Sequence, residues 1–158
     1  MRKYFIITII ILICIAGCTN SDVFFKYKKI RSSGWDKDST LVFDFVIADT
    51  SLTYNVYVNI RNTSEYPYQN FWFFIKKSTA KRGNTFAVFA TDTIECYLAD
   101  GRGKWLGNGI GAAYEMPLLI EQGAVFDSNT CRYEIVQGMR CDILRGISDI
   151  GLRVEKIE

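Results

Sequence analysis

The sequence predicts an all-β protein, an antiparallel β-sandwich of jelly-roll type with one short helix near the C-terminus. Apolar and polar residues alternate with a period of two from Tyr54 to Arg61, a pattern typical of a strand with one buried and one wet face. Similar short segments recur along most of the chain, separated by turns rich in Asp, Asn, Ser and Gly. These strands are too few and too irregular for repeated blades, which favours a sandwich.

The first element, residues 1–17, is predicted to be a lipoprotein signal peptide. Arg2 and Lys3 precede an apolar run over 4–16, which is shorter than the about 20 residues that a membrane-spanning helix needs. The run leads into Ile15-Ala16-Gly17-Cys18, which fits the lipobox, where small residues admit the protease and the cysteine thiol takes the lipid. An ordinary secretory signal followed by a chance cysteine is the alternative interpretation.

Lipid on Cys18 would hold the protein at a membrane without spanning it. One acyl chain binds only reversibly, whereas several chains anchor a protein stably. An Asp directly after the cysteine would indicate retention in the inner membrane, but this position is Thr19. Asp22 alone is a poor match to an acidic surface-export signal. We therefore expect a lipid-anchored protein of the cell envelope, on the periplasmic face of the outer membrane.

Residues 18–33 are predicted to form the lipid-anchored tether and an edge strand, and residues 34–158 the sandwich domain. The whole chain carries 19 Lys and Arg against 17 Asp and Glu, and the two counts become equal once Arg2 and Lys3 leave with the signal. This balance gives no general field for attracting nucleic acid. The exception is a local basic cluster of Lys26, Lys28, Lys29 and Arg31. It either contacts anionic headgroups or belongs to a solvated tether, and we favour the tether.

Several further strands and one helix are expected in the sandwich domain. The strands are expected over 40–48, 71–75, 86–89, 92–98, 116–120, 131–136 and 150–157. Segment 71–75 is apolar on both faces, as in a central strand or one covered by a loop. The helix is placed around Gln137 to Leu144, where Met139 and Ile143 lie four residues apart. Aromatic rings bury large areas, so four are assigned to the core: Phe43, Phe45, Phe71 and Phe73.

Cysteine usage predicts neither a metal site nor a defined disulfide. Cys14 leaves with the signal and Cys18 takes the lipid, so three thiols remain: Cys96, Cys131 and Cys141. They allow one disulfide and one free thiol, and the sequence leaves the pair open. A buried free thiol is expected at Cys96, because a strand pattern surrounds it. The chain has no CxxC motif and no histidine, so we expect no zinc site and no cofactor.

The absence of histidine also removes the commonest general base near neutral pH, and with it the Ser-His-Asp and Cys-His types of catalysis. Asp92 and Glu95 lie three apart on opposite strand faces, which does not predict a facing carboxylate pair. Asp36 and Asp38 resemble the start of a calcium loop whose glycine and glutamate are missing. We therefore predict a binding protein and not an enzyme; a carboxylate enzyme is the remaining catalytic alternative.

The best candidate for a binding patch is the loop over 100–107, because loops on a rigid scaffold carry function. It offers Arg102, Lys104 and Trp105, and we add Trp72 as a second exposed ring. For each tryptophan, a place at the core rim and a place on a contact surface are equally supported. Flat rings also stack on sugars, so a glycan-binding module is the alternative to protein–protein contacts.

Four groups of residues occur in a fixed order along most of the predicted mature chain. They are Cys18; Tyr54-Asn55-Val56-Tyr57 with Arg61-Asn62 and Tyr66-Pro67-Tyr68-Gln69-Asn70; Asp92-Thr93-Ile94-Glu95 with Leu98-Ala99-Asp100 and Gly103-Lys104-Trp105-Leu106-Gly107; and Gln137-Gly138-Met139-Arg140 with Gly146-Ile147 and Asp149-Ile150-Gly151-Leu152-Arg153. Together they resemble the gliding-motility lipoprotein H family (GldH).

The resemblance implies an envelope lipoprotein of gliding bacteria or of their non-gliding relatives. Such a protein would be an accessory component of the motility and linked secretion machinery, acting through contacts with other envelope proteins and carrying no catalytic residues. Bacteria of this kind O-glycosylate exported proteins at short triplets, which Asp38-Ser39-Thr40 and Asp92-Thr93-Ile94 match.

Overall fold

A computed structural model describes residues 21–81, 85–110 and 112–157. The signal peptide and Cys18 lie outside these residues. The described part of the chain forms strands and no helix: β1 (Asp22–Lys29), β2 (Trp35–Asp36), β3 (Leu41–Val46), β4 (Tyr54–Thr63), β5 (Asn70–Lys81), β6 (Thr85–Tyr97), β7 (Asn108–Ile110), β8 (Ala113–Ala124), β9 (Thr130–Gln137), β10 (Ile143–Leu144) and β11 (Ile147–Lys156).

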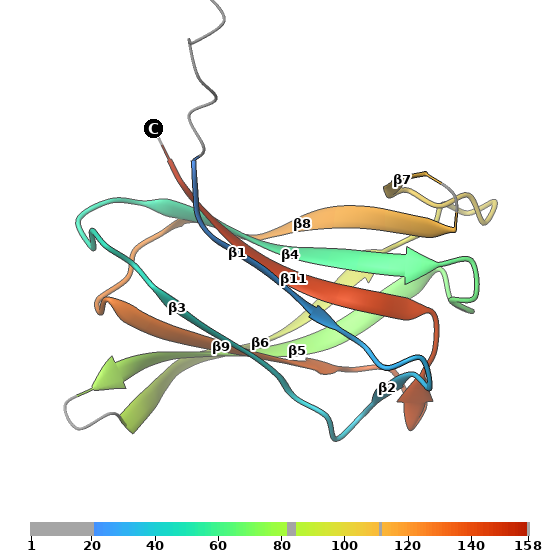
Figure 1. The fold of residues 1–158 in the computed structure, drawn as a ribbon, viewed down its shortest axis with the longest axis horizontal. Helices are drawn as coiled ribbons and strands as arrows, with labels where there is room; N and C mark the ends of the chain where they lie inside the picture. The colour runs from blue at the N-terminus through green and yellow to red at the C-terminus, as the bar shows by residue number, and fades with distance from the viewer. Residues whose placement is uncertain (1–20, 82–84, 111, 158) are drawn as a thin grey trace, which may run out of the picture.

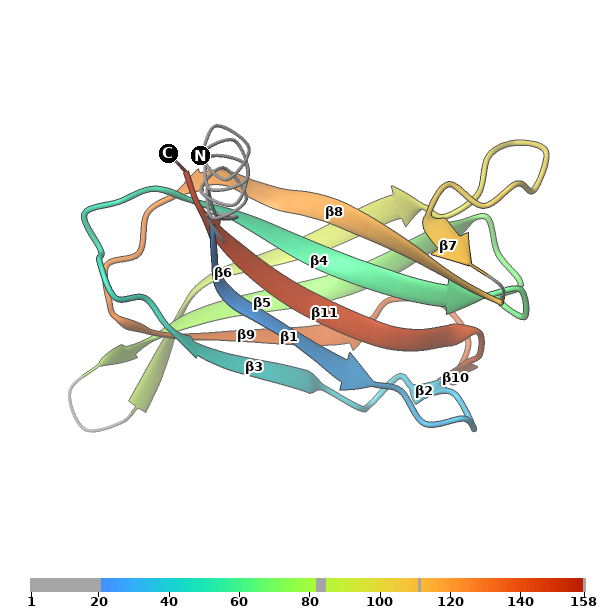
Figure 2. The same cartoon turned by 45° about the horizontal axis from the view of Figure 1, so that its top comes forward.

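Two antiparallel sheets make up the fold. The larger has five strands in the order β1-β11-β4-β8-β7, and the smaller has four in the order β3-β9-β5-β6. Figures 1 and 2 show these sheets as facing layers. The short strands β2 and β10 pair with each other at one end. β1 and β6 are edge strands, which places the expected edge strand next to β11.

One hydrophobic core fills the space between the two layers. Strand β4 shows how the sequence builds it: Tyr54, Val56, Val58 and Ile60 are buried, as their alternation predicts. Phe43, Phe45 and Ile47 are buried from the opposite sheet, and so are Phe71, Phe73 and Ile75 of β5. The core assignments of Phe43, Phe45, Phe71 and Phe73 are therefore confirmed.

The expected strands are present, most of them longer than predicted. The two strands expected over 86–89 and 92–98 form one, β6, with a bulge opposite the step from Lys77 to Ser78. β5 is an interior strand of its sheet, and Trp72 and Phe74 on its outer face are exposed, so no loop among the described residues covers them. The apolar run over 71–75 therefore has one buried and one open face.

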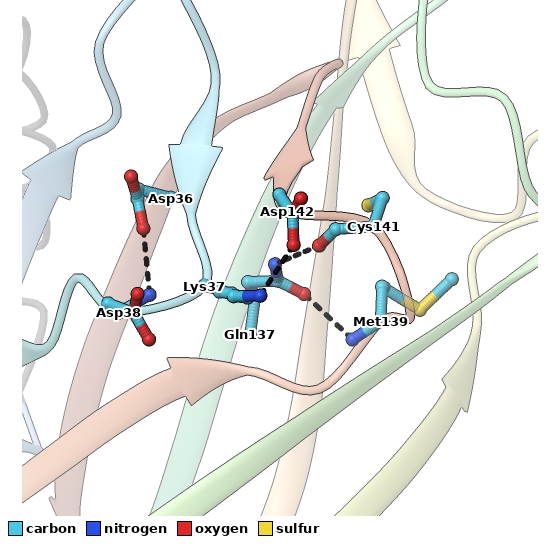
Figure 3. Close-up of polar contacts among 7 residues, drawn as sticks. All are labelled: Asp36, Lys37, Asp38, Gln137, Met139, Cys141 and Asp142. Carbon is cyan, nitrogen blue, oxygen red and sulfur yellow. Dashed lines mark hydrogen bonds and ion pairs between the residues drawn. The ribbon is translucent and has the colours of Figure 1, made fainter.

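The helix expected around Gln137 to Leu144 is wrong. Gln137 is the last residue of β9, and Ile143–Leu144 is β10, with a loop between them. The buried Gln137 amide organises this loop: its Nε2 donates to the Cys141 carbonyl at 2.9 Å, and its Oε1 accepts from the Met139 backbone N–H at 2.7 Å (Figure 3). Two backbone groups that would form hydrogen bonds within a helix are thus bonded to the Gln137 side chain. A segment this short has too few turns to form a stable helix without those bonds.

The three cysteines of the domain are free thiols. Cys96 and Cys131 are buried, and burial raises the pKa of each thiol to about 12, so neither is ionised near neutral pH. The expectation of a buried free thiol at Cys96 is confirmed. Cys141 is half-buried in the loop after β9.

Candidate functional site

The outer face of the four-stranded sheet carries a row of exposed aromatic rings. Successive side chains of a strand point to opposite faces. Because Phe71 and Phe73 point into the core, Trp72 and Phe74 point outward, with exposed fractions of 37% and 45%. Tyr97 of β6, opposite Asn70 in the register, is exposed on the same face. Tyr68, in the turn before β5, is exposed as well.

Part of this face is hollowed into a groove of about 470 Å³. Six residues from two segments line it, and we call it the β5 groove: Tyr68, Asn70, Trp72, Gly138, Met139 and Arg140. A second hollow of about 510 Å³ lies beside β2, lined mainly by polar and charged residues. Its tryptophan, Trp35, is buried with its indole N–H donated to the Ser39 carbonyl, so that ring is part of the core and not a contact surface. We therefore take the β5 groove as the candidate site.

Backbone contacts hold the two walls of the groove together. The Gly138 N–H donates to the Trp72 carbonyl at 2.7 Å, and the Trp72 N–H donates to the Met139 sulfur at 3.4 Å. A Cβ added at Gly138 would lie 3.2 Å from the Trp72 backbone and 3.2 Å from the Phe74 ring. The glycine therefore allows the loop after β9 to approach β5 closely, and Gln137 holds the next residues in place (Figure 3).

The buried Tyr66 contacts two residues of the groove, Tyr68 and Asn70. Burial raises the pKa of Tyr66 well above its usual range, and its hydroxyl donates to the Asn70 carbonyl at 2.8 Å. Its ring contacts Tyr68 at a centroid distance of 5.7 Å and Phe71 at 6.4 Å. The neutral tyrosine thus ties the turn before β5 to the core.

The predicted patch residues lie in two places. Arg102, Lys104 and Trp105 share one loop, in which the Asp100 carboxylate accepts the backbone N–H groups of Arg102 at 2.8 Å and Lys104 at 2.9 Å. These hydrogen bonds hold the pKa of Asp100 below its usual range. Trp72 belongs to the β5 groove, whose lining does not include the other three.

Trp105 is a rim residue of the core. Its half-buried ring packs on Tyr114 at 5.7 Å and on Tyr66 at 6.4 Å between centroids. Tyr66 also contacts Tyr68 of the groove, so it lies between the predicted loop and the β5 groove. Whether the loop and Trp72 bind anything stays a prediction.

Sequence reasoning missed five residues of the groove: Tyr68, Asn70, Gly138, Met139 and Arg140. A signal for them was present, since Tyr66–Asn70 and Gln137–Arg140 are two of the segments that carry the family resemblance. The structure brings these segments, about 70 positions apart in the chain, to the two sides of one groove. No group of metal-ligating side chains gathers within the residues that the structure describes.

Comparison with known proteins identifies the family. The model of the GldH lipoprotein family matches residues 22–154. The chain belongs to the GldH lipoprotein family. It is 32% identical to a gliding motility lipoprotein GldH homolog of Christiangramia forsetii, over 99% of this chain and 98% of that protein. It is 30% identical to the gliding motility lipoprotein GldH of Flavobacterium johnsoniae, over 95% of this chain and 94% of that protein.

Membership of a lipoprotein family places the chain in the cell envelope, held by lipid, as the lipobox predicts. Within 21–81, 85–110 and 112–157 there is no helix long and apolar enough to cross a bilayer.

Solved structures give weaker similarities. The VP2 subviral particle of infectious bursal disease virus is 14% identical with a TM-score of 0.39, over 87% of this chain and 31% of that one. Desmodium yellow mottle tymovirus is 9% identical with a TM-score of 0.34, over 89% of this chain and 90% of that one. With TM-scores below 0.5, these matches support no conclusion about the chain.

Proposed function

We propose that this chain is a lipid-anchored, non-enzymatic accessory component of the gliding-motility and linked secretion machinery, and that it holds a protein partner in the β5 groove. Membership of the GldH family and the names of its relatives from Christiangramia forsetii and Flavobacterium johnsoniae support a role in motility. The lipobox at Cys18 supports the anchor.

The composition of the β5 groove is the observation that carries the proposed partner contact. Trp, Tyr and Arg dominate the energetics of protein–protein contacts, and Met adapts its shape to a partner. Trp72, Tyr68, Arg140 and Met139 combine all four types around one hollow, on a surface that neither sheet covers.

The same lining supports a non-enzymatic role. None of the six groove residues is a carboxylate, a hydroxyl or thiol nucleophile of the Ser, Thr or Cys type, or a histidine. General acid–base and nucleophilic catalysis most often depend on such groups, and the Tyr68 hydroxyl is the one remaining group of the six that could take part in proton transfer. The residues present offer stacking surfaces, an amide and one fixed positive charge, which suit recognition.

The proposed site of action is the periplasmic face of the outer membrane. Thr19 after the lipobox cysteine and the lack of an acidic run behind it support this location over retention at the inner membrane or export to the cell surface. Radiolabelled fatty acid and membrane fractionation would locate the protein.

We also propose that the domain is a β-sandwich of jelly-roll type. Its eight long strands pair in a nested order, first with last (β1 with β11), second with seventh (β3 with β9), third with sixth (β4 with β8) and fourth with fifth (β5 with β6). A long hairpin folded over on itself gives this order and divides the strands between two sheets.

A site-specific photocrosslinker tests the protein contact in the native host. We expect a crosslinker at Arg140 to capture one defined envelope protein, and Trp72→Ala to abolish the capture while leaving the amount of protein in the membrane unchanged. A crosslinker at Lys26, exposed on β1 in the other sheet, is the control position and should capture nothing. Equal capture from Arg140 and Lys26, or unchanged capture in Trp72→Ala, would contradict the proposal.

Glycan binding is the second candidate, because Trp72 and Tyr68 present rings beside the polar groups of Asn70 and Arg140. Sugars stack on such rings and hydrogen-bond to neighbouring polar groups. Titration with envelope oligosaccharides, followed by tryptophan fluorescence, separates the candidates. A change that saturates and disappears in Trp72→Ala, but persists in Trp105→Ala, would favour the glycan over the protein partner.

A further inference from the structure

The end of the domain where β1 begins is built from four neighbouring segments. The Lys156 N–H donates to the Ser21 carbonyl at 2.9 Å, and the Ile157 N–H donates to the Thr53 carbonyl at 3.0 Å. A further hydrogen bond joins the turn over 47–53 to the loop over 125–129: the Ile47 N–H donates to the Asn129 carbonyl at 2.7 Å. Figures 1 and 2 show these segments at the end opposite β2, β7 and β10. We call this the anchor end.

The anchor end carries the two most exposed large aliphatic side chains of the described residues. Val125 has an exposed fraction of 70% and Val46 of 64%. Buried neighbours hold both in this position: Phe126 packs on Phe45 with ring centroids 5.8 Å apart, so the residues beside these rings are turned outward. Exposed apolar side chains are stabilised when an adjoining apolar phase covers them.

The chain length before Ser21 limits what can lie against this end. Cys18 precedes Ser21 by three residues, which span at most roughly 11 Å when fully extended. Lipid on Cys18 would therefore keep Ser21, where the chain enters the anchor end, within that distance of the membrane. The tether is therefore much shorter than the domain that it holds, because β1 alone, with eight residues, is about 26 Å long.

The β5 groove and all three tryptophans lie toward the other end. Trp35 pairs with Leu144 in the short sheet of β2 and β10, beyond the end of β1. Trp72 contacts the loop after β9 that leads into β10, and Trp105 packs on Tyr66, whose backbone lies against Gly146.

We propose that the domain stands end-on on a lipid surface, with Val125 and Val46 in the headgroup region and the β5 groove directed away from the bilayer. This proposal rests on the proposed lipid anchor at Cys18. Apolar side chains gain from entering the boundary between headgroups and acyl chains, and the anchor makes that contact intramolecular. The orientation leaves the groove free for a partner that approaches from the aqueous side.

Tryptophan quenching by lipids tests the orientation in the full-length, lipidated protein. The protein is reconstituted into phosphatidylethanolamine and phosphatidylglycerol vesicles whose acyl chains are brominated close to the headgroup. We expect the native protein to lose little fluorescence, because its tryptophans face away. Val125→Trp should add fluorescence that the brominated lipids quench, whereas the matched variant Ile143→Trp, an exposed aliphatic position in β10, should add fluorescence that they leave unchanged.

A longer tether provides a second readout that does not depend on a substituted valine. Twelve Gly and Ser residues inserted before Ser21 would let the domain move about 20 Å from the surface, so the quenching of Val125→Trp should fall while vesicle flotation is unchanged. Val46→Trp repeats the test if Val125→Trp fails to fold. Equal quenching of Val125→Trp and Ile143→Trp, or quenching of neither, would overturn the end-on orientation. Failure of the native protein to float with vesicles would instead overturn the anchor at Cys18.

Discussion

Gly146 and Gly103 share a backbone conformation and differ in their surroundings. Their φ angles are +81° and +80°, in the left-handed region that L side chains rarely adopt. A Cβ added at Gly103 would meet nothing within 4 Å, whereas a Cβ at Gly146 would lie 2.3 Å from the Tyr66 backbone. The pair therefore separates the cost of the conformation from the cost of close packing.

We expect Gly103→Ala to lower the free energy of unfolding by about 1–2 kcal/mol, the cost of the left-handed conformation. Gly146→Ala should cost at least twice as much, because the turn before β5 must also move away from the new methyl group. Urea unfolding of the two variants, followed by circular dichroism, measures both values. Equal losses would show that the contact between Gly146 and Tyr66 is looser than described.

At the residue scale, alternation predicts which side chains are buried but not what lies over the other face. The burial of Phe71 and Phe73 followed from their hydrophobic character and the layer architecture. The exposure of Trp72 depends on what the rest of the described chain leaves open over the outer face of β5, which no pattern within the strand encodes. Met139 and Arg140 enter the site only through the register that places Gly138 beside Trp72, a contact between distant parts of the chain.

At the element scale, one tyrosine spans several strands of the larger sheet. Tyr27 of β1 is in register with Gly151 of β11, and a Cβ at Gly151 would lie 2.7 Å from its ring. The ring crosses the glycine, stacks under the Arg61 guanidinium at 3.8 Å, and donates its hydroxyl to Glu115 of β8 at 2.6 Å. Burial raises the pKa of Tyr27 to about 12, so it remains a donor at physiological pH.

Glu115 is the acceptor that joins these strands, and it makes the stability of the sheet depend on pH. Burial raises its pKa, but hydrogen bonds from Tyr27, Arg61 and Asn59 outweigh that effect and hold the pKa below the ordinary 4.5. A carboxyl group with a lowered folded-state pKa stabilises the fold above its unfolded pKa. That stabilisation is lost as pH falls through the folded-state value.

We expect Glu115→Gln to lower the free energy of unfolding by about 1–3 kcal/mol at pH 7, because the buried Asn59 and the partly buried Tyr27 and Arg61 lose a charged acceptor. The difference from the native protein should shrink as pH falls below 4.5, where the native carboxyl itself becomes protonated. Chemical denaturation at pH 7, 5 and 3 measures it. Glu65→Gln removes the same charge from an exposed turn and serves as control; if both variants gave the same pH profile, the hydrogen-bond network would not be the cause.

The expected helix shows where element type could not be predicted from spacing. Met139 and Ile143 suggested one helical face, yet Leu144, next to Ile143, is the buried residue, paired beside Trp35 in the short sheet. The strand ending at Gln137 is preserved because its side-chain amide bonds to the following loop. A single four-residue spacing carries little information when a buried amide and a glycine directly precede it.

At the scale of the whole molecule, the two sheets are joined by charge as well as by the apolar core. Lys77 of β5 is buried, and its ammonium lies 2.7 Å from Asp92 of β6 and 3.1 Å from Glu121 of β8, which belongs to the opposite sheet. Glu121 also accepts the Tyr133 hydroxyl at 2.8 Å. Burial lowers the pKa of Lys77, but the two carboxylates outweigh it and raise the pKa, so the lysine remains charged.

Removing the positive charge at Lys77 should destabilise the whole domain, because it leaves Glu121 partly buried without a counter-charge. We expect Lys77→Met to lower the free energy of unfolding by about 3 kcal/mol, the lower end of the cost of breaking a buried pair, since the Glu121 side chain is 23% exposed. The adjacent Lys76 forms an equally short 2.7 Å pair with Glu134 on the outer face, so Lys76→Met should cost less than about 1 kcal/mol.

Adding Glu121→Gln to Lys77→Met should restore part of the loss, because no unpaired carboxylate then remains between the sheets. Thermal and urea unfolding of the three variants measure these differences; similar losses in Lys76→Met and Lys77→Met would mean that the apolar core alone holds the two sheets together.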